Sequence, residues 1–268
     1  MKEYIKTFGK IIFFGGIYYS LQLFCGVLFS TFYFLTHRNI ELKQLMEEAQ
    51  KALLENIYIL TAISALITVV IYYFILRNKQ KNLWERCKVK RIHKSDLMIV
   101  GVIGVSVAIF SNSIVYLFSN KFDSYSKVNS IITNAYGSWV SMICVLVLIP
   151  IFEEVLFRGL IFNELKKKFN MFWAVLLQAL IFAIFHGNIL QGIYTFVLGV
   201  ILCIIYIETK SIFGNILCHI IYNMCGSVLG PLVLYYTSSF VYVDLILGLA
   251  ITIILLLHMI KRHKIIKY

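Results

Sequence analysis

The sequence predicts an all-α protein that crosses a membrane several times, and three observations lead to this fold class. Hydrophobic residues make up 60% of the chain and charged residues only 14%, whereas soluble proteins average about 45–50% and about 25%. The mean hydropathy is correspondingly high, at +0.84. The apolar residues also gather in long runs with basic residues between them, which is typical of transmembrane helices joined by loops.

Eight apolar runs are candidates for the membrane-spanning helices. A helix rises about 1.5 Å per residue, so about 20 residues cross the roughly 30 Å hydrocarbon core of a bilayer. No repeat or linker divides the chain, and we expect residues 1–268 to form a single membrane domain. The runs cover residues 11–35, 57–76, 97–118, 139–162, 171–187, 189–207, 211–230 and 241–260.

Lysine and arginine residues indicate which side of the membrane each loop occupies, because cytoplasmic loops are enriched in them. The N-terminal segment, residues 77–96, residues 166–168 and the tail from Lys261 to Lys267 are all basic. A chain with eight helices places these segments on one side, so we expect both termini in the cytoplasm. The same loops account for the net charge of +12, and a nucleic acid is therefore not an expected partner.

Two features modify this simple series of helices. Residues 41–55 alternate apolar and charged side chains at helical spacing, which predicts an amphipathic helix outside the second spanning helix or extending it. Pro150 lies inside the fourth apolar run, three residues before Glu153. A proline in that place removes a backbone donor, so we expect a kink beside the carboxylates that follow.

Ionisable residues inside the fourth run are the first indication of function. Glu153, Glu154 and Arg158 lie in LIPIFEEVLFRGLIF, although each charge at a bilayer centre costs roughly 2.5–3.5 kcal/mol on insertion scales. Glu154 and Arg158 are four residues apart and can form an ion pair on one helix face. Glu153 points about 100° away, toward neighbouring helices. Glu153 is thus the candidate for chemistry.

Two further helices supply polar groups that fit the same chemistry. His186 closes the fifth run, and His219 and Asn223 lie four residues apart on the seventh. A carboxylate and imidazoles in a partly dry cavity provide a general base for water and donors for an oxyanion, which fits hydrolysis of a peptide bond. A glutamate with two histidines can also bind zinc, and buried acids with histidines serve proton-coupled transporters. Spacing alone does not choose among these uses.

Three motifs carry a resemblance to a known family. They read EEVLFR at residues 153–158, FAIFH at residues 182–186 and HIIYN at residues 219–223. Together they resemble the EExxxR, FxxxH and HxxxN motifs of the CAAX protease and bacteriocin-processing family, intramembrane proteases related to type II CAAX prenyl endopeptidases. The resemblance covers residues 139–230, which we expect to be the catalytic core.

The resemblance implies a role for each residue. Glu153 would activate the attacking water with help from His186, and His219 with Asn223 would stabilise the tetrahedral oxyanion. Glu154 and Arg158 would hold the site together. The family is regarded as glutamic rather than metal-dependent, so the resemblance implies no cofactor, while zinc stays open as an alternative.

These observations predict an intramembrane endopeptidase in a multi-pass protein of a cell membrane, cutting near the cytoplasmic half of the bilayer. The expected partners are the lipid bilayer and a peptide or membrane-protein substrate. The isoleucine, lysine and asparagine usage resembles proteins of AT-rich bacterial genomes, which favours a bacterial plasma membrane and a small peptide or membrane protein over a prenylated CAAX protein. The alternatives are a non-catalytic immunity or binding protein and a proton-coupled transporter.

The depth of His186 is harder to reconcile with this prediction. Counted from the cytoplasmic helix ends, Glu153 lies about 14 Å deep and His219 about 12 Å. Counted from Met171, His186 lies about 22 Å deep. The fifth helix must therefore begin beyond the membrane surface or tilt if the three side chains are to meet.

Overall fold

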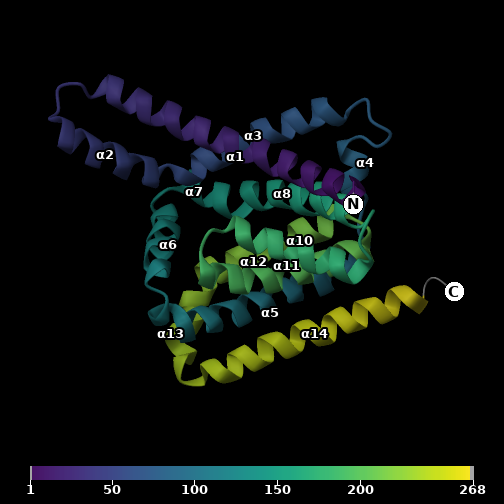
Figure 1. The fold of residues 1–268 in the computed structure, drawn as a ribbon. Helices are drawn as coiled ribbons and strands as arrows, with labels where there is room; N and C mark the ends of the chain where they lie inside the picture. Colours follow the sequence, from purple (N-terminus) through teal and green to yellow (C-terminus); the bar gives the residue numbers. More distant parts are fainter. Residues whose placement is uncertain (1, 266–268) are drawn as a thin grey trace.

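The structure is a computed structural model that describes residues 2–265, and every regular element in this part of the chain is a helix. The axes of most of the longer helices are roughly parallel, and the start of the first helix and the end of the last helix lie at the same side of the molecule (Figure 1). The α-helices are α1 (Lys2–Thr36), α2 (Leu42–Glu55), α3 (Ile57–Leu76), α4 (Leu83–Cys87), α5 (Lys94–Phe118), α6 (Asp123–Asn134), α7 (Trp139–Ile143), α8 (Ile149–Glu154), α9 (Asn163–Leu165), α10 (Met171–Phe185), α11 (Ile189–Thr209), α12 (Ile212–Met224), α13 (Gly230–Thr237) and α14 (Val241–Ile265). The 3-10 segments are η1 (Ser119–Lys121), η2 (Ala135–Gly137) and η6 (Ser238–Phe240), and the π-helical segments are η3 (Cys144–Leu148), η4 (Val155–Phe162) and η5 (Cys225–Leu229).

Within the described residues, six helical stretches are long and apolar enough to cross a membrane, which confirms a polytopic helical membrane protein. The predicted run at 171–187 forms the shorter α10, of 15 residues. The number of eight spanning helices and the side of the membrane on which the termini lie stay predictions. The stretches are Lys2–Thr36, Ile57–Leu76, Lys94–Lys121, Trp139–Leu165, Ile189–Thr209 and Ile212–His263.

The last of these stretches folds back on itself. A Cβ on Gly104 of α5 would meet the Cys218 carbonyl in α12, while Ser106 of α5 hydrogen-bonds Thr252 of α14. Near the start of α5, Arg262 at the end of α14 forms an ion pair with Asp96 at 3.0 Å, whereas a Cβ on Gly214 at the start of α12 would meet the Ile92 side chain just before α5. The helices α12 and α14 therefore run in opposite directions along α5, as expected of two separate helices at 211–230 and 241–260.

All the described basic segments gather at one end of the bundle. Lys10 and Arg86, from the N-terminal helix and from α4, both form ion pairs with Glu164. At the same end, the Ile212 amide donates to the Lys88 carbonyl at the start of α12. This arrangement fits the predicted topology, although Lys267 lies outside the described residues.

The helical stretch from Trp139 to Leu165 carries the candidate site and alternates between α- and π-helix. In a π-helix each amide bonds the carbonyl five residues earlier, and the Ile149 amide does so with the Cys144 carbonyl. Pro150 comes next and has no N–H. The Val145 carbonyl, five residues before Pro150, is consequently left without a main-chain donor in this register.

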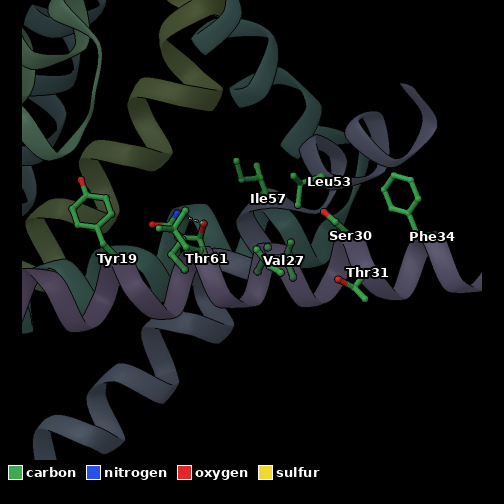
Figure 2. A pocket seen from close by; sticks show the side chains of 12 residues that line it. Tyr19, Val27, Ser30, Thr31, Phe34, Leu53, Ile57 and Thr61 are labelled. Atoms are coloured by element: carbon green, nitrogen blue, oxygen red, sulfur yellow. Dashed lines mark hydrogen bonds between the residues drawn. The ribbon is translucent and has the colours of Figure 1, made fainter. Parts of the chain in front are cut away.

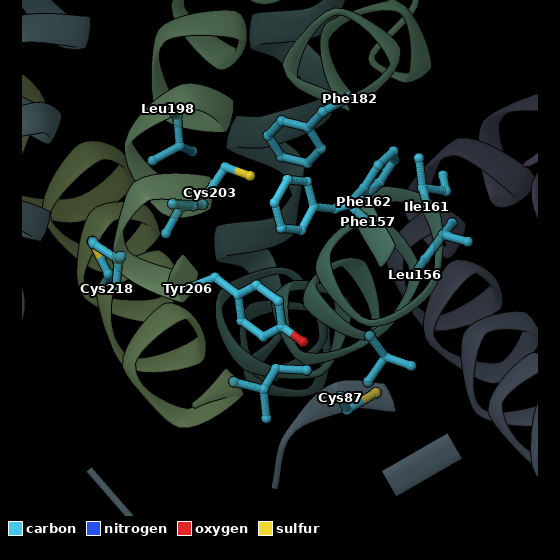
Figure 3. Packing of buried hydrophobic residues seen from close by; sticks show 14 of the residues in the cluster. Cys87, Leu156, Phe157, Ile161, Phe162, Phe182, Leu198, Cys203, Tyr206 and Cys218 are labelled. Carbon is cyan, nitrogen blue, oxygen red and sulfur yellow. The ribbon is translucent and has the colours of Figure 1, made fainter. Parts of the chain in front are cut away.

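The buried core surrounds this central stretch. Phe157 of η4 packs edge-on against Phe182 of α10, with ring centroids 4.8 Å apart (Figure 3). A groove of about 710 Å³ lies outside this core, between α1 and the corner where α2 meets α3 (Figure 2). Its lining is largely apolar and extends from Tyr19 to Phe34 along α1.

Candidate active site

Glu153 and Glu154 are the last two residues of α8, and the structure gives them different environments. The Glu154 side chain is fully buried, whereas the Glu153 side chain is 20% exposed. The break between α8 and the π-helical η4 comes directly after them. π-Helical turns inside α-helices are frequent at functional sites.

Three side chains satisfy the buried Glu154 carboxylate. Arg158 Nη1 donates to Glu154 Oε1 at 3.0 Å, which is the ion pair that the spacing of four residues predicts. His219 Nδ1 lies 2.8 Å from the same oxygen, and Asn215 Nδ2 donates to Oε2 at 3.2 Å. Arg158 also donates to the Gly199 carbonyl of α11 at 3.1 Å. Glu154 thus ties its own helix to α12, and Arg158 ties it to α11.

His219 lies between the two carboxylates. Its Nδ1 contacts Glu154, and its Nε2 is 3.6 Å from Glu153 Oε2. Since a carboxylate only accepts, a neutral His219 carries its proton on Nδ1 and leaves Nε2 free as an acceptor. The protonated ring donates from both nitrogens. The pair Glu154–His219 therefore fixes the ring so that Nε2 faces Glu153.

His186 approaches the site from the end of α10. Its Nδ1 is 2.8 Å from the Phe182 carbonyl, so the other ring nitrogen is the free one. The Phe182 ring lies between the two imidazoles, with its centroid 4.8 Å from the His186 ring and 6.0 Å from the His219 ring. Among the described residues no hydrogen bond or ion pair joins His186 to Glu153. The structure brings Glu153, Glu154, Arg158 and His219 into direct contact, and the Phe182 ring joins His186 to this group.

Asn223 makes a contact that the sequence does not predict. Its Nδ2 donates to the Val145 carbonyl at 3.2 Å, the group that the missing N–H of Pro150 leaves free. Asn223 lies one helical turn after His219, as the spacing predicts. One of its two amide hydrogens is thus used to join α12 to η3, and the other remains for a different partner.

Two residues of the site were missed as candidates. Asn215 lies four residues before His219, so Asn215, His219 and Asn223 share one face of α12, and this spacing is the pattern that identifies it. Phe182, the first residue of the FAIFH motif, contacts both histidines and also receives the Arg158 guanidinium, whose carbon is 4.8 Å from the ring centroid. The signal for Phe182 in the sequence is its place as the first residue of the FxxxH motif, four residues before His186.

The groove beside α1 approaches the same region. Tyr19, which lines the groove, packs on Phe185 with ring centroids 4.9 Å apart. The preceding Tyr18 packs on Phe152, next to Glu153, with ring centroids 4.5 Å apart. Within the described residues, no cluster of three or more histidine, cysteine or acidic side chains is arranged to hold a metal ion.

Comparison with known proteins agrees with the motifs. Residues 135–225 match the family described as type II CAAX prenyl endopeptidase Rce1-like. The chain is also 27% identical over 195 residues to "Putative membrane peptidase YdiL" of Bacillus subtilis (strain 168), covering 70% of this chain and 79% of that protein. No solved structure matches. The predicted resemblance is thereby confirmed, and Glu153, His186, His219 and Asn223 lie within the matched range.

Proposed function

We propose that this protein is a membrane-embedded endopeptidase of the glutamic type, in which Glu153 activates water. The observation that carries the proposal is the His219 imidazole fixed between two glutamates, with Nδ1 on the buried Glu154 and Nε2 facing the partly exposed Glu153. Structural pairing accounts for Glu154 and Arg158. No comparable structural pairing explains why Glu153 lies in the membrane. Among the described residues, its one ionisable partner within 4.0 Å is His219.

The attacking water would bind where two acceptors converge. Glu153 Oε2 and a neutral His219 Nε2 lie 3.6 Å apart, and one water about 2.8 Å from each can donate a hydrogen to both. Glu153 would take the proton as the water attacks the peptide carbonyl. The free nitrogen of His186 would help to orient this water from the end of α10.

His219 would then act as a donor to the oxyanion. The proton that Glu153 takes from the water would pass to His219 Nε2, 3.6 Å away, and the protonated ring would donate it to the oxyanion and then give it to the leaving amine. The buried Glu154 carboxylate, 2.8 Å from His219 Nδ1, would stabilise the positive charge of the ring meanwhile. The second amide hydrogen of Asn223 is available to the same oxygen. Donors held in place before the reaction stabilise the developing charge more than mobile ones, and removing one such donor costs about 10²–10³ in rate.

The proposed location is the plasma membrane of a bacterium, and the proposed substrate is a small peptide or a membrane protein. The basic residues at one end of the bundle support a cytoplasmic placement of that end. The residues Glu153 and His219 lie among apolar helices, so the scissile bond would have to enter the membrane to reach them.

The test compares peptides released in cells that carry the wild type, Glu153→Gln or Glu55→Gln. Glu55, on the amphipathic α2, supplies a matched control for the loss of one negative charge. We expect a set of peptide ends that depends on Glu153 and persists in the control, measured by mass spectrometry of membrane and medium fractions. Membrane levels of each variant are measured alongside. If Glu153→Gln inserts normally and releases the same peptides, the endopeptidase proposal fails and a binding or transport role replaces it.

A further inference from the structure

A second group of polar residues lies at the basic end of the bundle, away from Glu153. Three lysines from separate segments contribute to it: Lys88 after α4, Lys166 after α9 and Lys210 after α11. The Lys88 ammonium lies 4.5 Å from the centroid of the Tyr206 ring, and the Lys166 ammonium lies 5.6 Å from that of Phe162. We call these three residues the lysine cluster.

The surroundings of the lysine cluster are ordered by specific contacts. The Phe162 and Tyr206 rings meet edge to face, with centroids 6.0 Å apart, and the Tyr206 hydroxyl points toward the Cys87 segment (Figure 3). That hydroxyl donates to the Arg86 carbonyl at 2.8 Å. Lys88 and Lys210 both have left-handed backbones, with φ of 52° and 51°, which non-glycine residues seldom adopt. Contacts with the rest of the protein must therefore hold Lys88 and Lys210 in these backbone conformations.

Some other cations at this end of the bundle have acidic partners. Glu164 binds Lys10, Arg86 and Lys167, and Asp96 binds Arg262. The lysine cluster forms no ion pair among the described residues. The Ile212 amide, two residues after Lys210, donates to the Lys88 carbonyl at 3.4 Å and so holds the Lys210 segment beside Lys88. Burial, followed by the charges of Lys166, Lys210 and Lys90, lowers the pKa of Lys88 to about 8. An anion bound among the three ammonium groups would remove this repulsion.

The position of the cluster indicates which kind of anion fits. It lies where α11 ends and α12 begins, at the boundary of two apolar helices. Trp84 and Val89, in the same segment as Lys88, are 47% and 44% exposed. Tryptophan is enriched at the level of lipid headgroups, and basic pockets between helices at the cytoplasmic surface bind phosphate-bearing lipids. The segment thus places the apolar side chains of Trp84 and Val89 and unpaired lysines together at the depth of the lipid headgroups.

We propose that Lys88, Lys166 and Lys210 form a binding site for the phosphate group of an anionic phospholipid. The lipid phosphate would lie among the three ammonium groups, and its acyl chains would lie along the apolar helices beside them. This site is separate from the proposed endopeptidase centre and does not depend on it.

The experiment uses the full chain in nanodiscs that contain either phosphatidylcholine alone or phosphatidylcholine with phosphatidylglycerol. Native mass spectrometry measures how many phosphatidylglycerol molecules remain bound and how tightly. The variant Lys88→Gln/Lys166→Gln/Lys210→Gln should lose about a hundredfold in affinity, since each lysine near a membrane surface contributes about fivefold. The variant Lys43→Gln/Lys51→Gln/Lys127→Gln removes the same charge elsewhere and should change affinity by less than about twofold.

Two further measurements, with arginine variants and with inorganic phosphate, distinguish the possible outcomes. Replacing the same three lysines with arginine preserves the charge and should preserve binding, which separates loss of the site from loss of the fold. Equal losses in the two glutamine variants would show that only total charge matters and would overturn the proposal. Displacement of phosphatidylglycerol by millimolar inorganic phosphate would show a free-phosphate site and would overturn the assignment to lipid.

Discussion

Adjacent substitutions at Glu153 and Glu154 should have opposite consequences for stability and chemistry. Both changes to glutamine remove one negative charge and keep the shape of the side chain. Glu154 is fully buried and pairs with the fully buried Arg158 at 3.0 Å. Glu153 is partly exposed, and its contact with His219 is 3.6 Å long. The pair of variants therefore separates a residue that holds the fold from the residue that we propose as the catalytic base.

The expected magnitudes follow from these environments. Removing one partner of a buried ion pair costs about 3–5 kcal/mol, because the other charge is left uncompensated. Glu154→Gln should thus shift the unfolding equilibrium by about two to four powers of ten. The substitution also replaces one carboxylate oxygen with an amide NH₂, which is a donor and cannot accept a hydrogen bond from Arg158, His219 or Asn215. Glu153→Gln should change the free energy of unfolding by less than about 1 kcal/mol, as expected of a partly exposed pair.

The assay is reversible unfolding of each purified variant in mixed micelles, followed by circular dichroism. Peptide release in cells is measured in parallel. We expect Glu153→Gln to fold like the wild type and to release no Glu153-dependent peptides. Glu154→Gln should unfold far more easily. Equal stabilities for the two variants, or a larger loss for Glu153→Gln, would refute the division of roles drawn from the contacts.

Three other predictions concern the supports of the site and the choice of chemistry. Asn215→Ala leaves one oxygen of Glu154 without its donor, so it should destabilise the protein by about 1–3 kcal/mol in the same unfolding assay. Gly199→Ala would place a Cβ 3.0 Å from the Ala179 backbone, and the overpacking should cost about 1–3 kcal/mol. The control Gly26→Ala, with nothing within 4 Å of its Cβ, should leave stability unchanged or raise it slightly. Chelator treatment should leave peptide release intact, and a loss restored by added zinc would contradict the glutamic mechanism.

The sequence predicts the part of this structure that depends on periodicity and local spacing. The spanning runs, the amphipathic segment seen as α2, and the pair Glu154–Arg158 follow from helical geometry. Helical geometry also places Glu153 about 100° from Glu154 and separates their roles. It does not show that one imidazole lies between the two carboxylates. A histidine ring has nitrogens on two sides, so it can contact both carboxylates although they diverge.

The position of His186 depends on where α10 ends, which spacing cannot give. Gly187 has φ of 66° and ends the helix at His186, as glycine in a left-handed conformation commonly does. With 15 residues, α10 is about 22 Å long, short of a full bilayer span. The His186 ring folds back along α10, because its Nδ1 lies 2.8 Å from the Phe182 carbonyl. The Phe182 ring contacts both imidazoles, so the two histidine rings lie closer in depth than a count of residues from Met171 indicates.

The polar face of α12 explains how this site can be rigid within an apolar bundle. Asn215 binds Glu154, His219 binds both glutamates, and Asn223 binds the Val145 carbonyl, so three successive turns of α12 are fixed to the central helical stretch. Apolar packing distinguishes poorly between helix–helix and helix–lipid contact, whereas buried hydrogen bonds specify one register. A slide of α12 by one turn would break all three contacts together. The interactions that set the helix register therefore also hold the His219 ring against Glu153, which is the preorganisation that the proposed hydrolysis requires.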